Sequence, residues 1–160
     1  MGVVQTFVGF SSTDIESYNL MKSWGKLIGF NFNFTTCGMH ESPKANDILH
    51  VKSVCRSRIK KGDKYIMLLG KDTRSQYKYI RWEAEVAIAK GCTIIAVNLN
   101  GLHYFNPKTC PPVINNVGAI FIGFTPEIIS HAISNYKKVP AGNYKYSHSV
   151  YKKLRHGATA

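Results

Sequence analysis

Glu83 is the residue whose type and surroundings point most directly to chemistry. It lies in a predicted helix over residues 77–90, about 60° around the helix axis from Ile80, at the margin of an apolar stripe. Its neighbours one helical turn away are Tyr79, Ile80, Val86 and Ala87, none of which can pair with a carboxylate. This setting predicts a partly desolvated carboxylate, able to face a cationic reaction centre.

Glu85, on the same helix, provides the contrast. Arg81 precedes it by four residues, a spacing that predicts an ion pair on the helix surface. Helical periodicity alone also allows a simpler interpretation of Glu83, as a surface glutamate at the edge of a packed face. The residue pattern leaves both interpretations of Glu83 open.

Two polar segments follow predicted strands and could bind phosphate. Residues 10–14 (Phe-Ser-Ser-Thr-Asp) join a strand to a helix, where backbone N–H groups and hydroxyls can hold an anion. The segment lacks the glycines of GxGxxG and the lysine of a P-loop, so an ordinary helix cap is the simpler interpretation. For residues 71–75 (Lys-Asp-Thr-Arg-Ser) we favour a solvated loop over a phosphate contact.

The other reactive side chains predict no further chemistry. No GxSxG motif supports a Ser-His-Asp hydrolase, and neither CxxC nor HxxxH occurs, so we expect no metal site. We expect reduced thiols, with Cys37 a passive loop cysteine. The chain shows no secretory signal and no apolar run long enough for a membrane helix, which together predict a cytoplasmic location without membrane contact.

Apolar strands alternate with helical patterns along the 160 residues, which fits one domain. Such alternation predicts an α/β fold, a doubly wound, flavodoxin-like parallel sheet of five strands with helices on both faces and a binding crevice at the carboxyl ends of the strands. The predicted strands are 3–10, 30–34, 65–69, 93–98 and 119–124, and the predicted helices are 14–28, 46–60, 77–90 and 126–138.

The net charge of +12 raises the expectation of an anionic partner. Much of this charge lies in residues 139–160, which we treat as a basic extension to a domain over residues 1–138. No acidic residue follows Glu127. The extension is a solvated tail, a last helix packed on the domain through its tyrosines, or a nucleic-acid-binding segment in which tyrosines stack and lysines contact phosphates.

Several segments resemble TIR domains, and most closely the TIR-like group of bacterial Thoeris anti-phage proteins, the ThsB type. The resemblance runs in order over residues 3–137 and is most specific around Arg81-Trp-Glu83. The segments that carry it are Thr6 to Asp14, Tyr65 to Gly70, Ser75 to Gly91 and Ile94 to Asn98. The sequence departs from the family at Gly9, where another residue such as serine is usual, and at Tyr79, where tryptophan is common. The loop from Thr35 to Pro43 carries no family signature.

The resemblance implies an NAD⁺-consuming enzyme, a nucleosidase or ADP-ribosyl cyclase. NAD⁺ would be its substrate rather than a cofactor, and the product an ADP-ribose-type signal, linear or cyclic, that activates a separate effector. It implies that Glu83 is catalytic and that Phe10 and Ser11 lie in the substrate pocket, to which we add Asp47 and Trp82 as candidates. Self-association through TIR surfaces is also implied. Two alternatives remain: a non-catalytic TIR-like interaction module, and a basic protein that binds nucleic acid.

Overall fold

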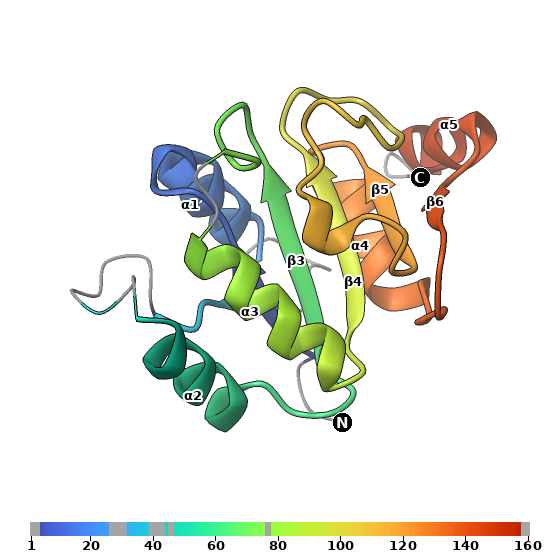
Figure 1. The fold of residues 1–160 in the computed structure, drawn as a ribbon. Coiled ribbons are helices and arrows are strands. Elements are labelled where there is room, and N and C mark those ends of the chain that lie inside the picture. The colour runs from blue at the N-terminus through green and yellow to red at the C-terminus, as the bar shows by residue number, and fades with distance from the viewer. Residues whose placement is uncertain (1–3, 26–31, 39–43, 45–46, 76–77, 158–160) are drawn as a thin grey trace.

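The computed structural model describes residues 4–25, 32–38, 44, 47–75 and 78–157 and shows a sheet with helices on both faces (Figure 1). The strand order is β2-β1-β3-β4-β5-β6, and every neighbouring pair is parallel. This arrangement confirms the predicted doubly wound α/β fold. The strands are β1 (Val4–Gly9), β2 (Phe32–Thr35), β3 (Lys64–Leu69), β4 (Thr93–Asn98), β5 (Ala119–Ile122) and β6 (Asn143–Lys145).

The central strands β3 and β4 are buried almost throughout, because helices cover the sheet on both sides. Met67 of β3 pairs with Gly9 of β1 on one side and with Ala96 of β4 on the other. The winding reverses between β1 and β3, since the chain leaves β1 for the edge strand β2 and then returns to β3. In sheets of this kind, ligands bind beyond the carboxyl ends of the strands at such a reversal.

Helices α2 (Ile48–Arg58) and α3 (Lys78–Ala89) cover one face, and α1 (Ile15–Trp24) and α4 (Pro126–Asn135) cover the other. Helix α3 lies across β3 with α2 alongside it (Figure 1), so its side chains meet both the sheet and a second helix. Its buried side is therefore wider than one amphipathic stripe. The buried residues of α3 are Ile80, Glu83, Ala84, Val86 and Ala87.

The helix starts follow from local side-chain chemistry. Asp47 caps α2 by accepting hydrogen bonds from the backbone N–H groups of Leu49 and His50 at 3.1 and 3.2 Å. Thr125 caps α4, with Pro126 at its first position, which agrees with the predicted start of this helix at residue 126. A 3₁₀ turn, η1 (Ser12–Asp14), precedes α1, and another, η2 (Pro112–Ile114), lies in the connection from β4 to β5. The first helix, predicted over residues 14–28, is observed from Ile15 to Trp24 with Gly25 as its C-cap, and residues 26–28 lie outside the described part of the chain.

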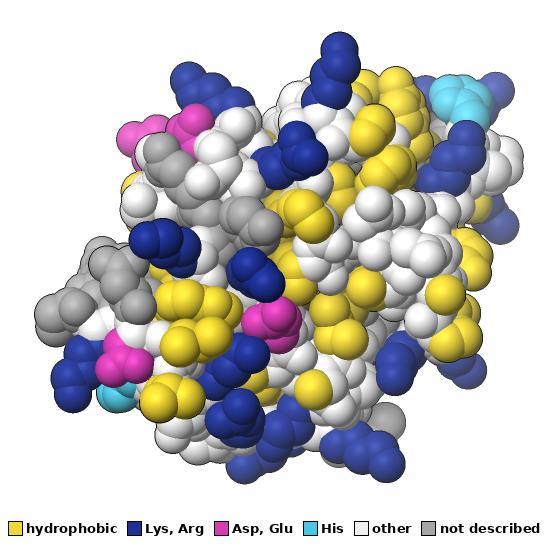
Figure 2. All heavy atoms as spheres, in the orientation of Figure 1, with side chains coloured by type: hydrophobic (Ala, Val, Ile, Leu, Met, Phe, Trp, Pro, Cys, Tyr) yellow, Lys and Arg dark blue, Asp and Glu magenta, His cyan; other side chains and the backbone are white. Residues whose placement is uncertain are grey.

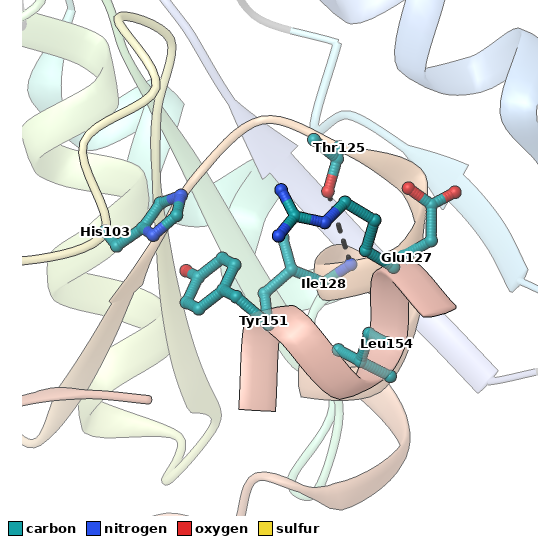
Figure 3. A pocket seen from close by; sticks show the side chains of 7 residues that line it. His103, Thr125, Glu127, Ile128, Tyr151 and Leu154 are labelled. Atoms are coloured by element: carbon teal, nitrogen blue, oxygen red, sulfur yellow. Dashed lines mark hydrogen bonds between the residues drawn. The ribbon is translucent and has the colours of Figure 1, made fainter. Parts of the chain in front are cut away.

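The basic extension is folded onto the sheet. Strand β6 pairs with β5, and α5 (His148–Gly157) packs Val150, Tyr151 and Leu154 against the core. The Tyr151 hydroxyl accepts a 3.1 Å hydrogen bond from the backbone N–H of Gly123, and its ring stacks on His103 at 3.6 Å between centroids (Figure 3). The structure therefore agrees with the second of the three interpretations of this segment, a last helix packed on the domain through its tyrosines.

The sheet has a sixth strand beyond the five predicted from the sequence. Strand β6 escaped prediction because all three of its residues are exposed, so it carries no alternating apolar pattern. Within the described parts of the chain, no helix has the length and apolar character needed to cross a membrane.

Candidate functional site: a buried carboxyl group at the end of β1

Glu83 is buried in the core, with 2% of its surface exposed. The Tyr65 hydroxyl donates a 3.3 Å hydrogen bond to its Oε1 atom. No ion pair to Glu83 exists within the part of the chain that the structure describes. The interpretation of Glu83 as a surface glutamate is therefore wrong, and the carboxyl group is more deeply desolvated than its place on the helix predicts.

Glu85 shows the opposite environment on the same helix. Its carboxylate pairs with Lys52 of α2 at 3.1 Å and with Arg81 at 3.7 Å, and its side chain remains 34% exposed. The Arg81 pair confirms the ion pair predicted from the four-residue spacing. Helix α3 therefore carries one glutamate that is ion-paired at the surface, Glu85, and one that is buried, Glu83.

Gly9, at the carboxyl end of β1, leaves the space that Tyr65 and Glu83 occupy. A Cβ atom at this position would overlap the Tyr65 hydroxyl and would lie 3.2 Å from Glu83 Oε1. The departure from the family at Gly9 therefore has a steric reason in this chain. The Glu83 carboxyl group therefore lies beside the last residue of β1, at the carboxyl ends of the strands, where ligands are expected to bind.

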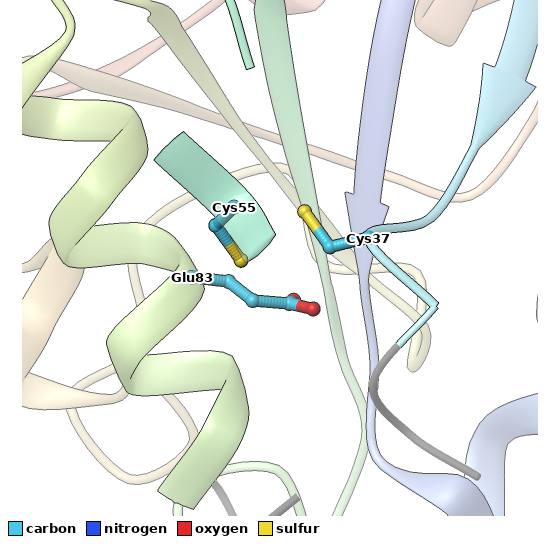
Figure 4. A group of neighbouring side chains, drawn as sticks. All are labelled: Cys37, Cys55 and Glu83. Atoms are coloured by element: carbon cyan, nitrogen blue, oxygen red, sulfur yellow. The ribbon is translucent and has the colours of Figure 1, made fainter. Parts of the chain in front are cut away.

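Two thiols lie beside this carboxyl group (Figure 4). Cys37, just beyond β2, and Cys55, on α2, have Sγ atoms within 4.8 Å of each other and of a carboxylate oxygen of Glu83. Both cysteines are buried, and all four cysteines of the chain are free thiols. Contact with Cys55, together with burial, raises the pKa of the Cys37 thiol, so Cys37 is not an exposed reactive cysteine.

Burial also decides the protonation of the acid. It raises the pKa of Glu83 well above the ordinary value of 4.5, Cys37 adds to this effect, and the hydrogen bond from Tyr65 opposes it. Burial and the nearby Glu83 raise the pKa of the Tyr79 hydroxyl as well. The site thus favours a neutral carboxylic acid, and a nearby positive charge would lower the pKa of Glu83 and favour the carboxylate.

The first turn is joined to α3 through its backbone. Tyr79 donates a 2.7 Å hydrogen bond to the carbonyl oxygen of Phe10, so tyrosine at this position ties the helix to the end of β1. The Phe10 ring faces the other side of the sheet and stacks on Tyr18 at 4.6 Å between centroids. Ser11 is buried and shares a 3.2 Å hydrogen bond with Thr13. The structure therefore brings the backbone of Phe10, but not its ring, toward the Glu83 side.

The reversal point between β1 and β3 holds a second polar group. The Asp14 carboxylate lies so close to Gly70 that a Cβ atom on residue 70 would overlap it. The buried Thr73 hydroxyl accepts a 2.9 Å hydrogen bond from the Gly70 N–H and lies 3.4 Å from Asp14 Oδ2. Burial raises the pKa of Asp14, and its hydrogen bond with Thr73 opposes that effect.

The remaining predicted site residues lie elsewhere on the α2 and α3 layer. Asp47 is exposed at the start of α2, where its hydrogen bonds with Leu49 and His50 serve the capping role. Trp82 is half-buried and packs against the apolar cluster beneath α3. A role in substrate binding stays a prediction for both Asp47 and Trp82.

Basic side chains line a pocket at the carboxyl edge of the sheet. Lys71, Arg74 and Ser75 follow β3, and they meet Lys108 and Pro112 of the β4–β5 connection. On the face that carries α2 and α3, Lys and Arg side chains are spread widely, with few acidic groups among them (Figure 2). Lys71, Arg74 and Ser75 are exposed, as expected for a solvated loop, and a phosphate contact by this loop stays a prediction.

The partners that complete the Glu83 site could not be identified from the sequence pattern. Tyr65 lies in a continuous apolar strand. Its hydroxyl was the only feature that could have indicated a polar partner in the core, because a buried tyrosine usually needs a hydrogen-bond partner. Cys55 is on the buried side of α2, but nothing in its spacing along the sequence links it to Cys37 or Glu83. These three residues and Glu83 come from four separate segments of the chain.

The family comparison covers this site. The family model described as Thoeris protein ThsB, TIR-like domain, matches residues 7–104, from β1 to the connection after β4. The chain belongs to this family. Membership in the ThsB TIR-like family supports a role in anti-phage defence, in which Thoeris proteins work with partners, and TIR-like domains commonly self-associate. No curated protein matches the chain.

Proposed function

We propose that this ThsB-type TIR-like protein is an NAD⁺ nucleosidase or ADP-ribosyl cyclase and that Glu83 is its catalytic carboxylate. One observation carries the proposal. The carboxyl group is buried at the carboxyl end of β1 without an ion-pair partner among the described residues. Burying an acid without an ion-pair partner lowers the stability of the fold. Acids whose pKa values are shifted by such burial are found most often at functional sites.

The chemistry of NAD⁺ cleavage suits such an acid. Nicotinamide is already a cationic leaving group, so breaking its bond to ribose requires no general acid. The ribose carbon gains oxocarbenium character as that bond lengthens. A carboxylate held nearby in a low-dielectric site stabilises this charge strongly. Capture by water gives ADP-ribose and a proton, whereas capture by a hydroxyl of the same molecule gives a cyclic product and a proton.

Substrate charge would also activate the acid. The neutral form of Glu83 is favoured in the free protein because burial raises its pKa. The positive charge of a bound nicotinamide riboside would favour ionisation of the carboxyl group. Because Glu83 is only 2% exposed, substrate entry also requires a local rearrangement around it. We therefore expect the isolated protein to rest in a low-activity state until assembly or an infection signal opens the site.

Basic residues at the same sheet edge support an anionic substrate. Lys71, Arg74 and Lys108 line one pocket beyond the strands, and they would attract the diphosphate of NAD⁺. In the proposed defence role, the ADP-ribose-type product is a diffusible signal that activates a separate effector. The downstream partner therefore recognises the nucleotide rather than this chain.

Nicotinamide release from NAD⁺ tests the proposal. Wild type, Glu83→Gln and Glu85→Gln are compared alone, under crowding that promotes self-association, and in extract from phage-infected cells. We expect Glu83→Gln to lose at least about 100-fold in rate, as when an electrostatic stabiliser is removed, whereas Glu85→Gln stays within about twofold. Equal rates in wild type and Glu83→Gln would end the proposal. Mass spectrometry of the product distinguishes linear from cyclic ADP-ribose.

A non-catalytic interaction module is the second candidate, and the depth of Glu83 favours it. A carboxylic acid that is 2% exposed and hydrogen-bonded to Tyr65 can serve packing alone. Phage protection in cells separates the two functions. A module predicts full protection by Glu83→Gln together with no NAD⁺ loss in infected wild-type cells, whereas the enzyme predicts that this variant fails to protect.

A further inference from the structure

The Glu83 carboxyl group lies in a cluster with the thiols of Cys37 and Cys55, and the proposed NAD⁺ chemistry does not use these two thiols. Their ligand atoms all lie within 4.8 Å of one another, and all three residues are buried. Figure 4 shows the two thiols and the carboxyl group converging from the segment after β2, from α2 and from α3. Nothing in the sequence spacing pointed to this convergence.

We propose that Cys37, Cys55 and Glu83 form a binding site for a zinc ion. Two thiolates and one carboxylate are a ligand set that zinc accepts, and three protein ligands leave a fourth tetrahedral position open. Ligand atoms about 2.0 to 2.3 Å from a tetrahedral zinc ion lie roughly 3.3 to 3.8 Å from each other. The ligand atoms of the cluster lie within 4.8 Å of one another, so side-chain rotations that bring them closer together would reach that geometry.

Arg58 supplies the charge that such a site requires. Two thiolates and a carboxylate around a divalent ion leave one negative charge in the core, which is costly unless it is compensated. The Arg58 guanidinium donates a 2.7 Å hydrogen bond to the carbonyl oxygen of Cys37, so a positive charge lies directly beside the cluster.

Tyr65 supplies an outer-shell contact. Its hydroxyl donates to Glu83 Oε1 at 3.3 Å and thereby orients the carboxyl group. Hydrogen bonds of this kind hold metal ligands in position and tune their affinity. On zinc binding, each thiol and the carboxylic acid release their proton to solvent, and three metal–ligand bonds replace those protons.

Zinc at this site would withhold Glu83 from the substrate, because one carboxyl group cannot both bind the ion and face the ribose. This inhibitory consequence rests on the proposed NAD⁺ activity. The binding site itself does not, because it depends only on the positions of three side chains and Arg58.

Cobalt titration of the reduced, metal-free, full-length protein tests binding directly. We expect one Co²⁺ per chain, with the thiolate-to-cobalt charge-transfer absorption that only sulfur ligands produce, and we expect one equivalent of Zn²⁺ to abolish it. Histidines elsewhere on the chain can bind cobalt without this absorption. Its absence at saturating Co²⁺ therefore overturns the proposal.

Matched cysteine variants assign the ligands. Cys55→Ala and Cys92→Ala remove equally buried thiols, but only Cys55 belongs to the cluster. Competition with a chromophoric chelator should show zinc affinity at least about 100-fold lower for Cys55→Ala, beyond the 10- to 100-fold typical of a lost outer-shell partner. Cys92→Ala should stay within about threefold. Equal losses in the two variants contradict the assignment.

Glu83→Gln keeps the test decisive if Cys55→Ala fails to fold, since glutamine preserves the shape of the side chain. We expect at least about tenfold weaker zinc binding with the sulfur absorption retained, and unchanged affinity would remove Glu83 from the site. Nicotinamide release with and without zinc is measured separately. Zinc binding by a protein that cleaves no NAD⁺, even under crowding and in extract from phage-infected cells, would reject the enzymatic proposal alone. NAD⁺ cleavage without zinc binding would reject the metal site alone.

Discussion

The hydroxyl of Tyr65 lies 3.3 Å from Oε1 of Glu83 and donates a hydrogen bond to it inside the core. This contact joins the central strand β3 to helix α3 at the one carboxyl group that the family resemblance marks as catalytic. It also opposes the effect of burial on the Glu83 pKa, because the bond favours the charged form.

Tyr65→Phe should therefore move the activity of Glu83 toward higher pH. Loss of the hydrogen bond raises the pKa of Glu83 further, so the acid limb of the kcat/KM profile shifts upward and activity at neutral pH falls by about tenfold, a typical cost for a hydrogen bond to a charged group. The measurement is nicotinamide release across pH. Lower activity with an unmoved acid limb would assign Tyr65 a purely structural role.

Gly9→Ala should destabilise the protein through Tyr65. The added methyl group would overlap the Tyr65 hydroxyl, and overpacking of this kind costs about 1 to 3 kcal/mol. Thermal or urea unfolding of Gly9→Ala, Tyr65→Phe and the double variant measures the coupling. We expect the alanine to cost less when the hydroxyl is absent, and additive losses would contradict the steric account.

Glu83→Gln should flatten one part of the pH dependence of stability. Because the folded-state pKa of Glu83 is raised, its contribution to stability is fully present below the ordinary value of 4.5 and is lost as the pH rises from there through the raised value. For every tenfold change in the acid dissociation constant between the folded and unfolded states, this contribution amounts to about 1.4 kcal/mol.

Urea unfolding of wild type and Glu83→Gln between about pH 4 and pH 8 measures this effect, since this window begins near the unfolded-state pKa of a glutamate. The stability of wild type should fall relative to Glu83→Gln as the pH increases, and Glu85→Gln, which removes a surface carboxylate, should show no such trend. Parallel stability curves for wild type and Glu83→Gln would mean that the Glu83 pKa is not raised by folding.

Charge reversal on α5 tests the nucleic-acid alternative without removing β6 and α5 from the fold. Lys152 and Lys153 are exposed, while the neighbouring residues Val150, Tyr151 and Leu154 pack inward. Binding through α5 predicts that Lys152→Glu with Lys153→Glu lowers affinity for DNA or RNA and makes the slope of log affinity against log salt shallower by about one for each lost phosphate contact.

The exposed pair Lys60 and Lys61, reversed to glutamate in the same way, is the control for α5. Both double variants change the net charge equally, so only a localised binding surface distinguishes them. Equal losses of affinity would indicate general attraction of nucleic acid to a chain of net charge +12.

The arrangement of the fold was predictable because each signal for it is local. The run from Tyr65 to Leu69 is continuously apolar, as a strand buried on both faces must be, and the helical periodicity between the strands requires crossovers. Asp47 and Thr125 start their helices through side chains only a few residues from the N–H groups that they cap. The same locality predicted the Arg81–Glu85 ion pair and the absence of a helical partner for Glu83.

Only the tertiary structure decided what surrounds Glu83. The burial of this side chain depends on α3 packing against both the sheet and the neighbouring α2, and its neighbours Tyr65, Cys37 and Cys55 come from segments far apart in the chain. The direction of the Phe10 ring depends on the register of β1, and the space at Gly9 depends on where the Tyr65 ring ends. Periodicity within one element identifies an unusual carboxyl group, but the environment that sets its protonation and its partners arises from packing between elements.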